Sequence, residues 1–216
     1  MMKSYILFDF DGTLVDSAPA ILDCFEQVLR VHGMQPCRTI DASLIGPPLR
    51  QTLEALSGCN DPRMLDALSA SFKEVYDTEA CLRTSAYEGC HDLLEQLRVR
   101  GLTLAIATNK RLVPTQRIIQ ALGWQEMFAL VYASDSQPRR YADKAGMIAA
   151  LLHDGRIAPH SAVYVGDTDS DGKAAAANDV EFWPVAWGYG TFAPTDRPVE
   201  TSLQLLDRLA SPSVED

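Results

Sequence analysis

The sequence predicts an α/β fold, in which a doubly wound parallel sheet carries a helical domain inserted after its first strand. The first observation is a series of five short apolar runs, which end at polar or glycine-containing turns and mostly alternate with amphipathic helical stretches. The second is the segment of residues 16–86, which has helical patterns and no convincing strand. With 216 residues, 47% of them hydrophobic and 22% charged, the chain can bury a substantial core.

The five apolar runs are rich in β-branched or aromatic residues, which favours strands buried on both faces. We expect strands at Tyr5–Asp9, Leu102–Thr108, Leu130–Ala133, Ala162–Val165 and Phe182–Ala186. Helices are expected at Cys90–Arg100, Pro114–Leu122, Lys144–His153 and Gly172–Asn178. A strand followed by a helix, repeated in this way, is typical of a Rossmann-like sheet covered by helices.

The inserted segment offers three further helical patterns, each with a proline near its start. Proline fits a first helical turn because its missing N–H would have no partner there. We expect these helices at Pro19–His32, Pro48–Ser57 and Pro62–Glu79. The chain is thereby divided into an α/β core, residues 1–15 and 87–216, and a helical domain, residues 16–86. The tail Ser211–Asp216 is expected to be disordered.

Composition excludes several classes of partner. The formal net charge of -10 disfavours a general electrostatic hold on nucleic acid or on a membrane of anionic lipid. The N-terminal stretch has neither a signal-peptide cleavage site nor an apolar run long enough to span a bilayer. The five cysteines are scattered and never spaced as CxxC, which argues against disulfides and zinc. We therefore expect a cytoplasmic protein, a monomer or homodimer, that binds neither nucleic acid nor membranes.

Two carboxylates, Asp9 and Asp11, lie at the end of the first predicted strand. Residues two apart in an extended segment share a face, so both would converge at the carboxyl end of the sheet, where open parallel sheets bind ligands. Such close anions repel each other unless a divalent cation or a shared proton relieves them. Magnesium suits an all-oxygen site that meets a phosphate. On these residues alone, an acidic turn without a ligand is an equally good interpretation.

A second acidic cluster follows the fourth predicted strand. Gly166 allows a sharp turn, Asp167 stands at the strand end, and Asp171 lies where the next helix should begin. Helix capping could account for one of these acids, but not for a preceding acid at the same edge of the sheet. Asp169 is expected to face solvent and to have no role.

Two further segments supply neutral and cationic groups. Thr108 and Asn109 end the second predicted strand, where a hydroxyl and a backbone N–H can hold a phosphate oxygen. Lys144 opens a predicted helix and supplies the cation that carboxylates and a phosphate would require. Each is weak evidence alone, because threonine often starts a turn and a single lysine is usually a solvated surface charge.

Taken in order, the four segments resemble the haloacid dehalogenase-like hydrolase superfamily over nearly the whole chain. The DxDGT motif matches Asp9–Thr13, the second motif matches Thr108, the lysine motif matches Lys144, and GDxxxD matches Gly166–Asp171. Residues 16–86 resemble the small helical cap of the phosphoglycolate phosphatase-like branch. Further similarities to this branch are DGTLVDS, Gly46-Pro47-Pro48-Leu49, Thr108-Asn109-Lys110 and Trp187-Gly188-Tyr189-Gly190. Many members have proline after the lysine, whereas this chain has Ala145, and this departure leaves the substrate open.

The resemblance implies a magnesium-dependent phosphatase that hydrolyses a small organic phosphate monoester, either phosphoglycolate-like or a nucleotide or sugar phosphate. Asp9 would attack phosphorus and form an aspartyl-phosphate. Asp11 would protonate the leaving group and then take a proton from the attacking water. Thr108 and Lys144 would hold the phosphoryl group, and Lys144 would also keep Asp9 ionised.

The resemblance also implies the ligands of the metal and of the substrate. Mg²⁺ would be held by Asp9, the backbone carbonyl of Asp11 and Asp167, while Asp171 would orient metal-bound water. Substrate would contact Thr108, Asn109 and Lys144, and Arg50 in the cap is the candidate for an anionic group on the substrate.

Other functions fit the sequence less well than hydrolysis does. A sugar phosphomutase on the same scaffold often has valine where Thr13 stands, so Thr13 favours hydrolysis. A phospho-accepting signalling module is much shorter and has no helical insertion. A dehalogenase lacks the second acid of the first motif, here Asp11. A phosphonate hydrolase needs a cap lysine, and Lys73, the only one, is expected to be a solvated surface residue. A non-catalytic binding protein would not need all the motif residues.

Overall fold

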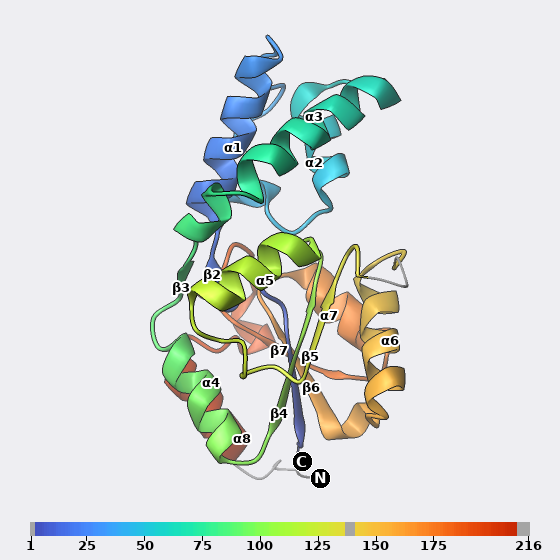
Figure 1. The fold of residues 1–216 in the computed structure, drawn as a ribbon. Helices are drawn as coiled ribbons and strands as arrows, with labels where there is room; N and C mark the ends of the chain where they lie inside the picture. Colours follow the sequence, from blue (N-terminus) through green and yellow to red (C-terminus); the bar gives the residue numbers. More distant parts are fainter. Residues whose placement is uncertain (1–2, 137–140, 211–216) are drawn as a thin grey trace.

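The computed structural model describes residues 3–136 and 141–210 (Figure 1). The expectation of a disordered tail at Ser211–Asp216 lies outside these residues, as does Arg140 in the segment before Lys144. The described chain forms a parallel sheet flanked by helices, and three helices of the inserted segment stand over one end of that sheet (Figure 1). No helix in the described ranges is both long and apolar enough to cross a bilayer.

The core sheet has five strands in the order β5-β4-β1-β6-β7, and every neighbouring pair is parallel. The strands are β1 Tyr5–Phe8, β4 Thr103–Thr108, β5 Leu130–Ala133, β6 Ala162–Gly166 and β7 Glu181–Pro184. The central strand β1 pairs with β4 on one side and with β6 on the other, so Phe8 lies opposite both Ile106 and Val165. The predicted α/β fold with a doubly wound parallel sheet is therefore confirmed.

Strand ends differ from the predicted ones by one or two residues. β1 ends at Phe8, although the N–H of Asp9 still donates to the carbonyl of Val165. The last strand was expected to reach Ala186 but ends at Pro184, because Val185 turns to a bridge with Val199 from a later segment. Such ends depend on the partner strand, which the pattern of a single segment does not contain.

Helices cover both faces of the sheet. The helices of the core are α4 Cys90–Val99, α5 Leu112–Ala121, α6 Lys144–Gly155, α7 Asp169–Ala176 and α8 Ser202–Ala210. Side chains of β1 alternate between the faces: Ile6 and Phe8 pack in the cluster that includes α4, α5 and α8, and Leu7 packs in the cluster with α6 and α7. Helix α8, which packs on α4, was not predicted, although its apolar residues recur at helical spacing.

The starts of two core helices correct the sequence-based boundaries. α7 begins at Asp169 rather than at Gly172, because Thr168 is the residue that caps it. α5 begins at Leu112, two residues before the expected Pro114, and the proline falls in its first turn. Both errors came from taking a glycine or a proline as the first helical residue.

The inserted segment forms the cap, with helices α1 Ala18–Val31, α2 Leu49–Ser57 and α3 Pro62–Tyr76 and a short 3-10 turn, η2, at Ala80–Arg83. α3 packs against both other helices, and the rings of Phe25 and Phe72 lie 4.8 Å apart at their centroids. The expectation that no strand occurs here needs correction. Val15–Asp16 (β2) pairs antiparallel with Ser85–Ala86 (β3), and this two-stranded ribbon joins the cap to the core. Two-residue strands have no periodicity that a sequence could reveal.

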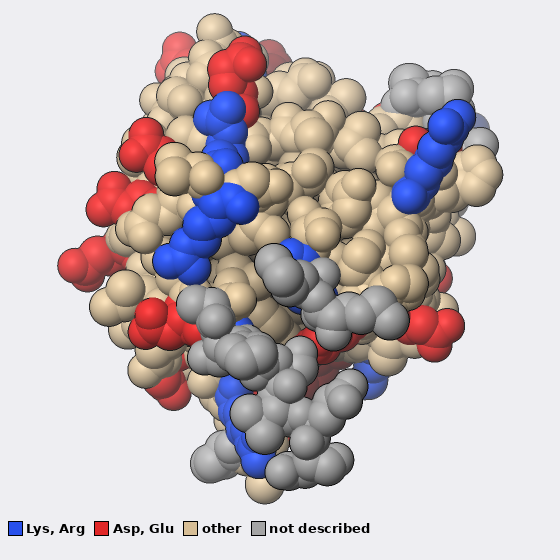
Figure 2. All heavy atoms as spheres, turned by 90° about the horizontal axis from the view of Figure 1, so that it is seen from below, with Lys and Arg blue, Asp and Glu red and all other residues tan. Residues whose placement is uncertain are grey.

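Charged side chains are spread over the surface of the core. On the side away from the cap, Figure 2 shows acidic and basic side chains interspersed among other residues, and the described atoms form no broad basic face there. This distribution agrees with the formal net charge of -10.

Candidate active site

The predicted site residues of three different segments meet at the carboxyl edge of the sheet. Asp9 follows β1, Asp167 follows β6, and Thr108 is the last residue of β4. These three strands are neighbours in the sheet, so their carboxyl ends are adjacent even though the residues are far apart in sequence. All three side chains are buried.

The two carboxylate oxygens of Asp9 have different surroundings. Oδ2 lies 2.8 Å from Nζ of Lys144, whereas Oδ1 is buried and has no hydrogen-bond partner among the described residues. Carboxylate oxygens of Asp9, Asp167 and Asp171 all lie within 4.8 Å of one another. A buried, unpartnered anionic oxygen beside further carboxylates is unfavourable unless a cation binds it. These residues therefore fit a divalent metal ion bound by oxygen ligands.

The acids perturb one another's proton affinity. The pKa of Asp9 is raised to about 7, chiefly by burial; the charges of Asp171 and Asp167 add to the rise, and Lys144 opposes it. Burial likewise raises the pKa of Asp167 to about 6, although the N–H of Tyr189 opposes the shift. Burial lowers the pKa of Lys144, but Asp171 and Asp9 outweigh it and hold that pKa well above its ordinary value. The cluster thus has more negative charge than Lys144 alone offsets.

Asp167 is fixed by the first motif and by a glycine-rich loop. Its Oδ1 accepts a hydrogen bond from the Thr13 hydroxyl at 3.2 Å, and its Oδ2 accepts one from the N–H of Tyr189 at 2.8 Å. Gly12 has φ of +82°, and a Cβ there would lie 2.2 Å from Oδ2 of Asp167. A Cβ at Gly188 would lie 2.3 Å from the Cβ of Asp167. The two glycines allow the backbone to enclose this carboxylate.

Asp171 has two roles in the structure. Its Oδ2 accepts hydrogen bonds from the N–H and the hydroxyl of Thr168, at 3.0 and 2.6 Å, which completes a capping box at the start of α7. Its Oδ1 accepts a bond from Lys144. Because Oδ1 of Asp171 is already paired with the ammonium group of Lys144, Asp171 is suited to orienting its neighbours more than to direct metal ligation. Asp169 is exposed, as expected.

Sequence reasoning missed one buried cation of the site. Nζ of Lys110 lies 2.8 Å from Oδ1 and 3.2 Å from Oδ2 of Asp11, and the Ser17 hydroxyl donates to the same Oδ1 at 2.6 Å. The side chain of Lys110 is only 4% exposed. The only available signal was its place in the Thr108-Asn109-Lys110 triplet, which carried a resemblance but no role.

The substrate candidates lie around one cavity of about 590 Å³ between the cap and the core. Its wall includes Thr108, Asn109 and Arg50. Nδ2 of Asn109 donates to the carbonyl of Gly46 in the cap at 2.9 Å. Arg50 forms an ion pair with Asp66 and is half exposed. The cavity wall thus contains three of the four substrate candidates but not Lys144, and two of these three, Asn109 and Arg50, already have partners within the chain.

Lys73 and Lys144 differ in their burial and in their relation to the site. Lys73 is exposed, as expected for a solvated lysine, yet it stands on the wall of the same cavity. Lys144 is buried at the first position of α6, preceded by Asp143, whose side chain accepts a bond from the N–H of Gly146. This N-cap fixes the start of α6 and so directs Lys144 toward Asp9 and Asp171.

A buried aspartate at the end of the first strand, beneath an inserted helical cap, is the arrangement of a capped α/β hydrolase. Residues 6–185 match the family described as haloacid dehalogenase-like hydrolase. The chain belongs to this family.

Among its relatives, the chain is 33% identical to a phosphoglycolate phosphatase from Rhodobacter capsulatus, over 87% of this chain and 86% of that one. It is 31% identical to the tyrosine-protein kinase PtkA from Mycobacterium tuberculosis, over 86% of this chain but only 62% of the relative's length. A solved haloacid dehalogenase-like hydrolase from Streptococcus pneumoniae superimposes with a TM-score of 0.83 at 25% identity, covering 95% of this chain and 98% of that chain.

Proposed function

We propose that this protein is a magnesium-dependent phosphatase that hydrolyses a small organic phosphate monoester through an aspartyl-phosphate. The observation that carries the proposal is the buried Asp9. One of its carboxylate oxygens pairs with Lys144, and the other lies near Asp167 and has no hydrogen-bond partner in residues 3–136 and 141–210. Asp11 lies on the wall of the same cavity. Relatives named phosphoglycolate phosphatase, at 29–33% identity, support the same reaction class.

Asp9, Asp167 and the backbone carbonyl of Asp11 would hold the metal. Asp171 would not bind it directly but would orient metal-bound water. Magnesium, when bound, supplies positive charge that offsets the charge on the transferring phosphoryl group. A bound cation would also stabilise the ionised carboxylates. Without one, the pKa of Asp9 is raised to about 7 and the pKa of Asp167 to about 6.

The chain's own residues divide the reaction into two displacements. In the first, a carboxylate oxygen of Asp9 bonds to phosphorus, the ester P–O bond breaks, and Asp11 gives its proton to the leaving oxygen. In the second, water attacks the phosphorus, its proton passes to Asp11, and the bond to Asp9 breaks with release of inorganic phosphate. Lys144 and Thr108 hold the phosphoryl oxygens in both displacements.

The substrate is a small phosphorylated metabolite whose leaving group occupies the cavity under the cap. A phosphoglycolate-like acid, a nucleotide or a sugar phosphate would each fit within about 590 Å³. Arg50 stays a prediction as the contact for an anionic group on the substrate. Arg50→Ala should lower kcat/KM for anionic substrates and leave it nearly unchanged for a neutral aryl phosphate.

A panel of phosphate monoesters, assayed with purified protein and Mg²⁺ for inorganic phosphate and for kcat/KM, tests the proposal. Turnover should stop in EDTA and in Asp9→Asn, because an amide cannot attack phosphorus at a useful rate. Asp169→Asn is the matched control, since this exposed acid stands two residues from Asp167, and it should retain activity.

Three results would contradict the proposal. Full activity of Asp9→Asn would show that Asp9 is not the nucleophile, and full activity of the chelated protein would show that no metal is required. Isomerisation of a sugar phosphate with little phosphate release would favour the mutase. Transfer of phosphate to protein tyrosine rather than to water would favour the activity for which the mycobacterial relative is named.

A further inference from the structure

Lys110 connects the two domains at the site. Its ammonium group donates to Asp11 in the core, at 2.8 Å, and to the hydroxyl of Tyr76 in the cap, at 2.7 Å. It also lies 4.7 Å from the centroid of the Tyr76 ring, which places the cation over an aromatic face. Tyr76 is the last residue of α3 and is buried. One buried cation therefore has one partner in each domain.

The residues on either side of Lys110 contact the cap as well. Asn109 donates to the carbonyl of Gly46, and Arg111 forms an ion pair with both carboxylate oxygens of Asp77. We name residues 109–111 the docking segment. It follows directly from Thr108 at the end of β4, so the strand that carries a phosphate-binding candidate also carries the main polar contacts to the cap.

Electrostatics makes the Lys110 contact dependent on the cap. A buried ammonium group is stable only when its donors are satisfied, and here Tyr76 both satisfies one donor and excludes water from the pair with Asp11. Burial lowers the pKa of Lys110, but Asp11 and Tyr76 outweigh it and hold that pKa above its ordinary value. If α3 moved away, Lys110 would be hydrated and its hold on Asp11 would weaken to that of an exposed ion pair.

We infer that Lys110 is a positioning residue for Asp11, and that the contact with Tyr76 makes this positioning depend on cap docking. The inference rests on the proposed function, in which Asp11 transfers the protons. Lys110 and the Ser17 hydroxyl both donate to Oδ1 of Asp11, and Lys110 also donates to Oδ2, so the carboxylate is held by both residues. The acid is then held in one orientation only while the cap covers the cavity, when the substrate is shielded from bulk water.

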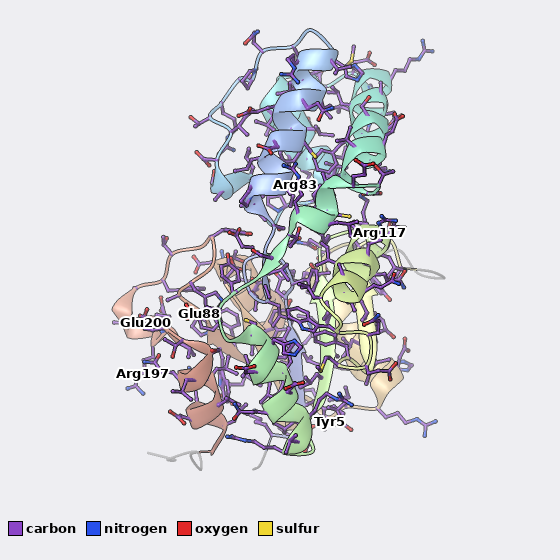
Figure 3. All side chains as sticks on the ribbon, turned by 60° about the vertical axis from the view of Figure 1, so that its left-hand side comes forward. Tyr5, Arg83, Glu88, Arg117, Arg197 and Glu200 are labelled. Atoms are coloured by element: carbon purple, nitrogen blue, oxygen red, sulfur yellow. The ribbon has the colours of Figure 1, made fainter. Side chains whose placement is uncertain are left out.

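The contact between Arg111 and Asp77 provides an internal comparison. It joins the same end of α3 to the same docking segment, but within the described part of the chain neither residue forms a hydrogen bond or ion pair with Asp11. Arg117, labelled in Figure 3 on α5, adds another such contact through the carbonyl of Thr78 at 2.6 Å. A variant that breaks the Arg111–Asp77 pair therefore weakens cap docking without removing the link from Tyr76 through Lys110 to Asp11.

Steady-state kinetics of four variants with an alkyl phosphate provides the first test. Lys110→Gln should lower kcat about 100-fold with KM changed less than about 3-fold, because general acid–base catalysis contributes about 10² to 10⁴ in rate. Tyr76→Phe removes only the hydroxyl and should lower kcat about 3- to 10-fold, a partial loss of the same effect. Asp77→Asn should change KM more than kcat. Arg83→Gln, which removes an exposed pair with Asp23 on the cap, should match the wild type (Figure 3).

A double-mutant cycle shows whether Lys110 acts through Asp11. Adding Lys110→Gln or Tyr76→Phe to Asp11→Asn should cause no further loss in kcat, since residues that act as one unit are not additive. With 4-nitrophenyl phosphate, whose leaving group needs no added proton, Lys110→Gln should keep the initial burst of nitrophenol but slow steady turnover. Multiplicative losses in the cycle, or an unchanged kcat in Lys110→Gln, would overturn the inference.

Folding and the proposed function are controlled separately. Circular dichroism and thermal melting are recorded for each variant. If Lys110→Gln does not fold, the cycle between Tyr76→Phe and Asp11→Asn tests the inference instead, and a further loss of kcat in the double variant would overturn it. An active wild type with an unimpaired Lys110→Gln overturns this inference alone. A wild type that releases no phosphate from any ester overturns the proposed function together with it.

Discussion

The three carboxylates of the cluster differ because each has a different set of partners within the chain. Asp167 is held through both oxygens by Thr13 and Tyr189, and Asp171 is held by Thr168 and Lys144. Asp9 alone has an oxygen with no hydrogen-bond partner among the described residues. The carboxylate oxygen that is free to bind a cation or a substrate therefore belongs to Asp9, the residue that is expected to react.

A first prediction concerns the pH dependence of stability without metal. The pKa of Asp9 is raised by burial from 3.8 to about 7, so the folded state holds this proton more tightly than the unfolded state does. The stabilisation is present below the unfolded pKa and is lost as the pH rises through about 7. In EDTA, the free energy of unfolding of the wild type relative to Asp9→Asn should fall by about 1–3 kcal/mol between pH 5 and pH 8. Urea unfolding measures this, and a difference independent of pH would contradict it.

A second prediction concerns Gly12. Gly12→Ala places a Cβ at φ of +82° and 2.2 Å from Oδ2 of Asp167, so both the backbone and the carboxylate must shift. We expect kcat/KM to fall at least about 100-fold, with a loss of about 1–3 kcal/mol in stability.

Gly33→Ala is the matched control for Gly12→Ala. Gly33 has φ of +65° but no atom within 4 Å of the added Cβ. It should cost about 1 kcal/mol in urea unfolding and leave kcat/KM unchanged. Equal activity of the two variants would show that the close approach to Asp167 is unimportant.

Among the elements, α7 has a short N-terminal turn that serves both the fold and the site. Thr168 is its N-cap, and Asp171 at the third helical position completes the capping box while it also contacts Lys144. The helix N-terminus carries partial positive charge and unpaired N–H groups, which favours a carboxylate at this place. The same residue thus satisfies the helix end and connects it to α6.

A third prediction tests this capping box. Thr168→Val keeps the shape of the side chain but removes the hydroxyl that accepts from the N–H of Asp171 and donates to its Oδ2. We expect a loss of about 1 kcal/mol in the free energy of unfolding and a fall in kcat, because Asp171 is then held by Lys144 and one N–H only. Thr78→Val, an exposed threonine that bonds backbone carbonyls at the end of α3, is the control. A Thr168→Val protein as stable and active as this control would contradict the prediction.

In the whole molecule, two sets of contacts tie the cap to the residues around the site. One is the docking segment, and the other is the ribbon of β2 and β3 with the start of α1 beside it. Tyr189 links this ribbon to the metal-binding candidates, since its backbone N–H donates to Asp167 and its hydroxyl donates to Asp16. The position of the cap is therefore coupled to the carboxyl edge of the sheet by both sets of contacts.

A fourth prediction concerns Tyr189. Its hydroxyl accepts from the N–H groups of Ser17 and Ala18, at 2.8 and 3.0 Å, so Tyr189→Phe leaves two N–H groups at the start of α1 without this acceptor. We expect a loss of about 1–3 kcal/mol in urea unfolding and faster hydrogen exchange at these two amides. Tyr5→Phe, at the other end of β1, is the control (Figure 3). Unchanged exchange at Ser17 and Ala18 would contradict the prediction.

The fold class and the motif positions could be predicted because their signals are local. Consecutive apolar residues indicated β1, β4, β5 and β6 within about one residue at each end, and the acids that follow β1 and β6 had to share one sheet edge once the strands were parallel. The ribbon of β2 and β3 could not be predicted in this way, because its paired residues lie 69 and 71 positions apart and two-residue strands carry no periodicity of their own. Helix α8 has apolar residues at helical spacing, but the helix α4 on which it packs lies far earlier in the chain.

The sequence by itself determined the order of the motifs, the residue types at the carboxyl edge and the presence of a helical insertion, since each depends on neighbours in the chain. Only the tertiary structure decided which side chains pair. It placed Lys110 between Asp11 and Tyr76, joined Arg50 to Asp66, and left one oxygen of Asp9 unpartnered among the described residues. These pairings depend on distances between elements that are far apart in the chain, and those distances are set only when the elements pack together.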